Sequence, residues 1–310
     1  MLQTLAVVLP IFALIFAGWL ARRVGVLGPQ ATTELNRFVV YLALPALLFD
    51  IIAHARWSDI WQPGFVAAFG LGSGLVFALT VAIRQRRGRP LADAAIDGLN
   101  AGYANTGYIG FPLALVALGP EAMATTLIAS ILTICLLFAV ALVLIEVGLQ
   151  SEQHPRDLAL KVGHSLIRNP LVLAPILGAA VPLSGLSVPA PAESFLKLLG
   201  GAASPCALVA LGLFMAAKRE QAAPEIGLTA ILVACKLLIQ PALTWAFAAA
   251  FGLSPFLTHA AVLIAALPTG TGPFMLAEFY GREAGITSRV VLISTLLSIL
   301  TVSGYLAFGL

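Results

Sequence analysis

The hydrophobic positions of this chain fall into long runs rather than the short alternating patterns of soluble helices and strands. A helix needs about 20 apolar residues to cross roughly 30 Å of hydrocarbon. Runs of this length, separated by charged or Pro/Gly-rich breaks, predict ten transmembrane helices over residues 2–21, 32–54, 62–83, 92–118, 121–148, 164–183, 192–217, 226–252, 256–279 and 284–309. The first run has no positive residue before it, and Arg22 and Arg23 follow it, so we expect a retained span rather than a signal peptide.

Composition supports a membrane location. Of the 310 residues, 60% are hydrophobic and 10% are charged, and the mean hydropathy is +1.00. So few charged side chains cannot cover the surface of a soluble globule of this size, so lipid must be the solvent for most of the chain. The sequence therefore predicts an all-α integral membrane protein of the inner (cytoplasmic) membrane. The net charge of +3 belongs to loops and does not indicate a nucleic-acid partner.

Basic residues are concentrated in alternate loops. Twelve of the 17 lie on one side of the predicted membrane: Arg22, Arg23, Arg84, Arg86, Arg87, Arg89, Arg156, Lys161, Arg168, Lys218, Arg219 and Arg282. The side richer in Lys and Arg is normally cytoplasmic, so both termini are predicted to lie outside. The extended polar stretch at 150–161 is then a cytoplasmic link that divides the chain nearly in half.

The two halves resemble each other. Glycines and prolines of the first half recur at an offset of 160 residues: Pro10, Gly18, Gly25, Pro29 and Pro45 are matched by Pro170, Gly178, Gly185, Pro189 and Pro205. This match predicts a first five-helix repeat over 1–148, a cytoplasmic linker over 149–163 and a second repeat over 164–310. Because five is odd, the second copy is inverted. Many secondary transporters have this architecture, with the substrate site near the midplane at the repeat interface.

The fourth span of each half is interrupted by glycine and proline. Pro112 in span four, and Pro268 and Pro273 in span nine, remove amide donors and clash with the preceding turn. Two opposed half-helices would aim amide groups and positive dipole ends into one cavity, which suits a carboxylate. The predicted substrate-binding residues in these breaks are Asn105, Thr106, Gly107, Thr269, Gly270 and Thr271. The alternative is a pair of kinked packing helices whose polar side chains bond to their own backbone.

Three stretches carry a resemblance to a known family. The motifs NTGYIGFPL at 105–113, LPTGTGPF at 267–274 and LPALLF at 44–49 look like the auxin efflux carrier family, which includes bacterial malonate-type carriers and plant auxin exporters. The resemblance implies a scaffold of helices 1, 2, 6 and 7, often dimeric. It also implies a transport domain of helices 3–5 and 8–10, whose crossed helices 4 and 9 bind an organic anion. Asn105 and Pro268 match the family's crossing residues, whereas Ala104 stands where plant carriers often have proline.

Two charged residues inside predicted spans need a partner or a cavity. Lys236 lies near the middle of span eight and matches a basic position in the family. We interpret its ammonium as an internal cation that stands where a coupling cation would; the alternative is a structural ion pair with Glu278. We interpret Asp50, on span two, as a candidate gate or proton site. The alternative interpretation is that Asp50 lies at the membrane interface near the outer surface.

No enzyme motif appears, neither HExxH, GxSxG nor GxxxxGK, and His and Cys are scattered, so we expect no enzyme, no cofactor and no metal site. A channel would need a continuous polar pore. The sequence favours a secondary transporter of small carboxylates with an alternating-access, elevator-like mechanism. Its expected partners are the organic anion, membrane lipid and a second copy bound through the scaffold helices. The alternative is a cation or proton antiporter of a related ten-helix fold, but 104–112 and 267–274 contain no acidic residue.

Overall fold

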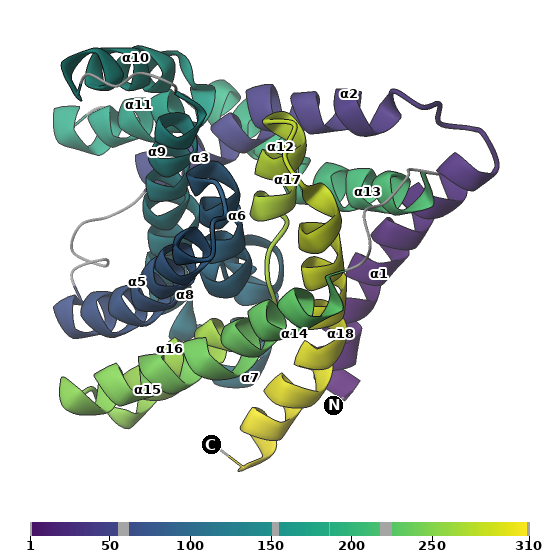
Figure 1. The fold of residues 1–310 in the computed structure, drawn as a ribbon. Coiled ribbons are helices and arrows are strands. Elements are labelled where there is room, and N and C mark those ends of the chain that lie inside the picture. The colour runs from purple at the N-terminus through teal and green to yellow at the C-terminus, as the bar shows by residue number, and fades with distance from the viewer. Residues whose placement is uncertain (1, 55–61, 151–154, 186, 218–224, 309–310) are drawn as a thin grey trace.

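The computed structural model describes residues 2–54, 62–150, 155–185, 187–217 and 225–308, and the regular structure of these residues is helical (Figure 1). The α-helices are α1 (Leu2–Arg23), α2 (Ala31–Phe38), α3 (Leu44–Ala53), α5 (Pro63–Arg86), α6 (Leu91–Gly102), α7 (Phe111–Leu118), α8 (Ala122–Ser130), α9 (Phe138–Leu149), α10 (Pro155–Arg168), α11 (Pro170–Ser184), α12 (Ala190–Gly201), α13 (Ala203–Ala216), α14 (Ile226–Ala234), α15 (Gln240–Ala250), α16 (Pro255–Ala265), α17 (Gly272–Phe279) and α18 (Ala284–Phe308). The prediction of an all-α fold is confirmed.

Several helical stretches are long and apolar enough to cross a membrane. Among the described residues there are six: Ala31–Ala53, Pro63–Arg86, Ala122–Leu149, Ala190–Ala216, Ile226–Ala250 and Ala284–Ala307. A seventh is present if Leu160–Arg168 and Pro170–Ser184 are taken as one bent span. Two shorter apolar helices, Thr106–Leu118 and Pro255–Ala265, belong to the predicted fourth and ninth spans. The chain is therefore a multi-pass membrane protein, whereas the count of ten stays a prediction.

Part of the predicted cytoplasmic linker is helical. The linker expected over 149–163 contains most of α10, while its residues 151–154 lie outside those that the structure describes; a bend of 71° separates α10 from α11. Asn169 caps α11 at the bend, because its Oδ1 accepts a hydrogen bond from the Leu171 amide at 3.0 Å. Pro170, at the first position of α11, needs no amide partner there. The apolar helix after the link thus begins at Pro170 rather than at residue 164.

Four π-helical turns continue the α-helices, over Val39–Ala43, Thr106–Gly110, Ile131–Leu137 and Cys235–Ile239. In three cases a proline lies two residues after the turn, as Pro45, Pro112 or Pro241. Proline has no amide hydrogen, and its ring clashes with the carbonyl four residues earlier. That carbonyl belongs to the central residue of the π turn in each case, so the wider turn accommodates the proline.

Helices α1 and α13 touch through their main chains. A Cβ atom on Gly18 would lie 2.1 Å from the carbonyl oxygen of Val209, and one on Gly212 would lie 1.9 Å from that of Ile15. Small residues permit such close packing of membrane helices. Helix α3 packs against α11 and α12, while α5 packs against α6 and α15. The helices expected in the scaffold and those expected in the transport domain thus each make extensive contacts among themselves.

Candidate functional site

Two helices break near their middles and meet there. The first unwinds between α6 and Thr106, and the second between α16 and α17. An antiparallel bridge joins Ala104 to Thr269. The amide of Asn105 donates to the carbonyl of Pro268 at 2.9 Å, and the amide of Gly270 donates to that of Tyr103 at 3.1 Å. The two breaks therefore satisfy each other's main-chain groups, as unwound backbone inside a membrane requires.

A single helix supports the carboxyl ends of both half-helices. Lys236, which is fully buried, donates from Nζ to the carbonyl of Ala265, the last residue of α16, at 2.7 Å. One turn later, Gln240 donates from Nε2 to the carbonyl of Gly102, the last residue of α6, at 3.1 Å, and to Ser73 Oγ at 2.8 Å. The last carbonyls of a helix have no partner within it, and these two side-chain donors supply one at each end. The structure thus provides Lys236 with a main-chain partner at the crossing.

The amino ends of the other two half-helices border a small cavity of about 30 Å³. It is lined by residues of the crossing and, opposite them, by residues of α3 and α13; these include Asn105, Thr106, Gly107, Gly270, Thr271, Leu44, Leu47 and Ser204. No acidic residue of the described chain is among those that line it. The first amides of a helix lack partners within the helix, so such a site suits an anion. This volume holds about one water molecule.

The predicted binding residues divide into two groups. Asn105, Thr106, Gly107, Gly270 and Thr271 line the cavity. The hydroxyl of Thr106 is buried and has no hydrogen-bond partner among the described residues. By contrast, Thr269 does not line the cavity, and its Oγ1 donates to the carbonyl of Asn100 at 2.8 Å.

Of the predicted helix-breaking prolines, Pro273 occupies the first turn of α17, where a missing amide hydrogen costs little. Pro112 does not mark the break, which corrects the prediction: it lies inside the continuous helix Thr106–Leu118, where the preceding π turn accommodates it. Pro268 lies in the break and accepts the bond from Asn105. Asp50 lies one turn beyond Leu47 along α3, with its Oδ1 3.0 Å from His54 Nδ1. It does not line the crossing cavity.

A layer of polar residues behind the crossing is absent from the sequence prediction. Asn100 donates from Nδ2 to Thr287 Oγ1 at 3.0 Å, and the amide of Thr269 donates to Ser294 Oγ at 3.1 Å. Gln240 belongs to the same layer. Its position four residues after Lys236 and directly before Pro241 is the one sequence signal that could have indicated it.

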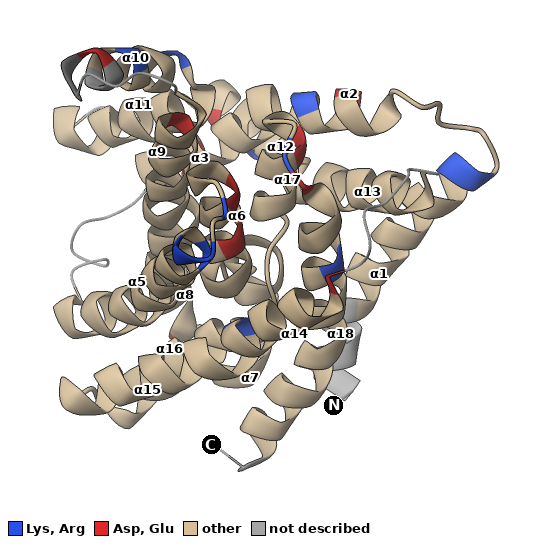
Figure 2. Ribbon diagram, in the orientation of Figure 1, with Lys and Arg blue, Asp and Glu red and all other residues tan. Residues whose placement is uncertain are grey.

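Arg84 and Arg282, counted above among the basic residues that indicate the orientation, also form ion pairs with α6. Arg84 Nε lies 2.7 Å from Asp97 Oδ2 and ties α5 to α6. Arg282 donates two hydrogen bonds to the Asp93 carboxylate, from Nε at 2.7 Å and from Nη2 at 2.6 Å. Figure 2 shows acidic positions along α6, with basic positions next to them. Both carboxylates, which sequence reasoning missed, are thereby committed to arginines.

Comparison with known proteins identifies the family of this chain. A family model described as "Membrane transport protein" matches residues 4–306. The chain belongs to this family. It is similar to a "Putative malonate transporter" of Rhizobium meliloti (strain 1021), with 34% identity over 309 residues, which cover 99% of this chain and 96% of that relative. It is also similar to "Auxin efflux carrier component 3a" of Oryza sativa subsp. japonica, with 33% identity over 160 residues, or 50% of this chain and 26% of that protein. The resemblance to auxin efflux carriers is confirmed, and the chain is a membrane transporter of that family, which is not a family of enzymes.

Proposed function

We propose that this member of the auxin efflux carrier family is a secondary transporter that binds small carboxylates at the crossing of its two broken helices. The observation that carries the proposal is the cavity where two half-helix amino ends meet neutral polar side chains, Asn105 and Thr271 among them. Helix amino ends favour anions. The full-length similarity to a relative named for malonate supports a carboxylate as the substrate.

The proposal includes ten spans arranged as two inverted repeats of five. The pair α6–α7 and the pair α16–α17 occupy corresponding positions, and each breaks at its middle. Figure 1 supports an even number of spans, because the first turn of α1 and the last turn of α18 lie at the same edge of the fold. With the basic loops inside, both termini are outside the cell membrane.

Transport proceeds by alternating access between a scaffold and a moving domain. The cavity lies between these parts: Leu44, Leu47 and Ser204 belong to scaffold helices, while the crossing belongs to the transport domain. A volume of about 30 Å³ is far below the roughly 300–1,000 Å³ of small-molecule sites. Loading therefore requires the crossing to move away from α3 and α13, in an elevator-like step. A homodimer through the scaffold would hold the fixed part still.

Lys236 supplies the positive charge that a coupling cation supplies in related folds. Its ammonium bonds to the end of α16, and its helix neighbour Gln240 bonds to the end of α6. Asp50 and His54, at the far end of α3 from the basic loops, form the outer gate of the substrate path. A cation antiporter is less favoured, because the acidic residues of α6, Asp93 and Asp97, are paired with arginines.

Thermal-shift measurements on the purified protein test the substrate class. Ligands that bind the folded state raise the melting temperature by mass action. We expect malonate and related small carboxylates to raise it in a saturable manner, and to be taken up by proteoliposomes that contain the protein. Saturable stabilisation by inorganic cations alone, with no carboxylate uptake, would contradict the proposal and favour the antiporter.

A further inference from the structure

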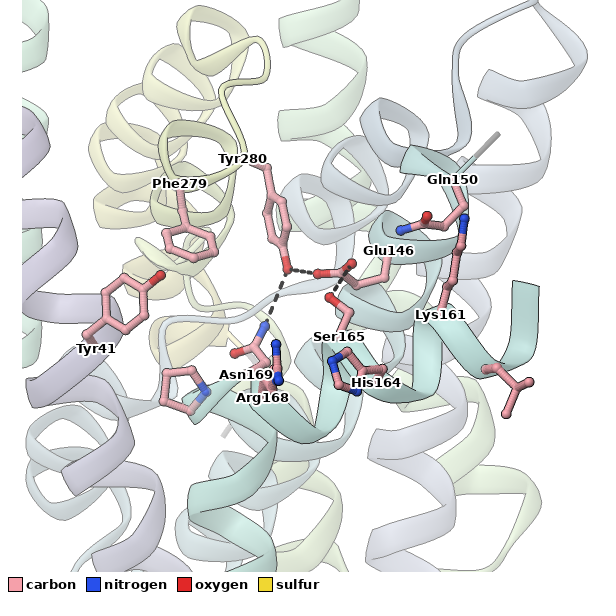
Figure 3. Close-up of a pocket in the computed structure, with 12 residues that line it drawn as sticks. Tyr41, Glu146, Gln150, Lys161, His164, Ser165, Arg168, Asn169, Phe279 and Tyr280 are labelled. Atoms are coloured by element: carbon pink, nitrogen blue, oxygen red, sulfur yellow. Dashed lines mark hydrogen bonds between the residues drawn. The ribbon is translucent and has the colours of Figure 1, made fainter. Parts of the chain in front are cut away.

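A second, larger cavity of about 560 Å³ lies where α9, α10, α11 and the end of α17 meet (Figure 3). Its volume falls within the range of small-molecule sites. Two helical segments line both cavities. Tyr41 borders the larger cavity and Leu44 the crossing cavity, while on α17 Phe279 borders the larger cavity and Met275 the crossing cavity. The larger cavity therefore lies about one helical turn from the candidate substrate site.

An aromatic contact borders the larger cavity on the side of α17. The rings of Tyr41 and Phe279 meet edge to face, with centroids 5.5 Å apart and an interplanar angle of 67°. Such pairs contribute about 0.5–1.5 kcal/mol beyond the area they bury. The contact joins the helix of the second predicted span to that of the ninth, and each of these helices also borders the crossing cavity.

One wall of the larger cavity is basic. Lys161, His164 and Arg168 all line it, and all three are exposed. Their spacing of three and four residues along α10 places them on one face of that helix. The neutral polar side chains of Gln150 and Ser165 lie beside them.

The carboxylate in the cavity is occupied by internal hydrogen bonds. Glu146 Oε1 accepts from Tyr280 Oη at 2.6 Å, and Oε2 accepts from Ser165 Oγ at 2.7 Å. Asn169 Nδ2 also donates to Tyr280 Oη, at 3.3 Å. Figure 3 shows Tyr280 pointing from the end of α17 toward Glu146 and Asn169. Glu146 is only 7% exposed, so the exposed charged side chains among those that line this cavity are the basic Lys161 and Arg168.

We propose that the larger cavity is a capture site for small carboxylates on the path to the crossing, built on the basic face of α10. This inference rests on the proposed transport of carboxylates. A cavity lined by charge of one sign concentrates ligands of the opposite sign and raises their association rate, an effect that falls steeply with ionic strength. Separation of Tyr41 from Phe279 then admits the captured anion to the crossing.

The test compares wild type with two double variants that remove the same charge. Lys161→Gln/Arg168→Gln neutralises the cavity wall, whereas Arg86→Gln/Arg87→Gln neutralises two exposed arginines of another basic loop. Uptake of labelled malonate into proteoliposomes is measured at low salt and at about 0.3 M salt, where the Debye length is below 10 Å. We expect the cavity variant to raise KM about 3- to 10-fold at low salt with kcat nearly unchanged, and the difference to shrink at high salt. The loop variant should match wild type.

Equal KM values in all three proteins, or an equal rise in both variants, would overturn the capture site. Uptake is repeated in phosphatidylcholine liposomes with and without phosphatidylglycerol. A KM difference that exists only with the anionic lipid would assign the basic wall to lipid phosphate instead and would refute the proposal.

Failure of the proposed function gives a different result. If wild type transports no carboxylate, inorganic phosphate is titrated while the melting temperature is followed. A saturable rise that Lys161→Gln/Arg168→Gln abolishes and Arg86→Gln/Arg87→Gln retains would support an anion site in the cavity. The same response in all three proteins would refute it.

Discussion

Replacing Lys236 with methionine tests the role of the buried ammonium most directly. Methionine has a similar length and no charge, so it removes the hydrogen bond to the carbonyl of Ala265 while filling most of the space. The side chain is fully buried, so no water replaces the lost donor. The substitution therefore changes the electrostatics of the crossing more than its packing.

The expected change in stability is small because two effects oppose each other. An unpaired buried carbonyl costs about 1–3 kcal/mol. Burying an ammonium costs several kcal/mol, which methionine avoids. The two contributions partly cancel, so we expect the free energy of unfolding to change by less than about 3 kcal/mol. The positive charge near the ends of α6 and α16 is lost entirely, so function should suffer far more than folding.

The assay is malonate uptake into proteoliposomes, with sodium exchanged for choline at fixed pH and membrane potential. Wild type should transport equally well in both cations, because the ammonium already occupies the cation position. Lys236→Met should lose uptake while it elutes as a folded protein with a similar melting temperature, and Lys236→Arg should retain part of it. A strict sodium requirement in wild type, or full uptake by Lys236→Met, would refute the internal-cation role.

The remaining predictions concern the crossing and the topology. Asn105→Ala should weaken malonate binding by about 1–3 kcal/mol in a thermal-shift titration without unfolding the protein; unchanged affinity would remove this amide from the site. Gly270→Ala should lower the melting temperature, because its Cβ would lie 2.8 Å from Tyr103 Cε1, and overpacking costs about 1–3 kcal/mol; a wild-type melting temperature would contradict the packing seen there. For the topology, single cysteines are introduced at position 255 or 88 of a cysteine-free variant of the protein. On intact cells, a membrane-impermeant thiol reagent should label the cysteine at position 255 and not the one at position 88. The reverse labelling pattern would show that the orientation is inverted.

The positions of the two breaks could be predicted from the sequence, whereas their connection could not. Glycine and proline have local effects on a helix, and α6 and α16 do end where these residues cluster. The bridge from Ala104 to Thr269 joins residues far apart in the chain and uses main-chain groups. Main-chain groups are the same in nearly every residue, so residue types do not show which of them will form hydrogen bonds across the two breaks. The partner of Lys236 was missed for this reason, since it is a carbonyl oxygen and not a side chain.

The helix α10 was not predicted from hydropathy. A search for long apolar runs finds spans that lipid surrounds, but α10 mixes Leu160 and Val162 with Lys161 and His164. Polar residues interrupt its apolar residues throughout, so the segment reads as a polar link. The ion pairs of Asp93 and Asp97 were missed because their arginines come from other parts of the chain, Arg84 from the end of α5 and Arg282 from the segment between α17 and α18.

At the contact between α1 and α13, no side chains separate the two helices. Gly18 faces the carbonyl of Val209 and Gly212 faces that of Ile15, so main-chain atoms touch without intervening side chains. Side chains that separate two helices can change rotamers and let them slide, but main-chain atoms cannot. We therefore expect α1 and α13 to move as one rigid body throughout the proposed transport cycle. A methyl group at Gly18 or Gly212 would push α1 and α13 apart. Such a substitution would impair transport although it lies far from the candidate substrate site.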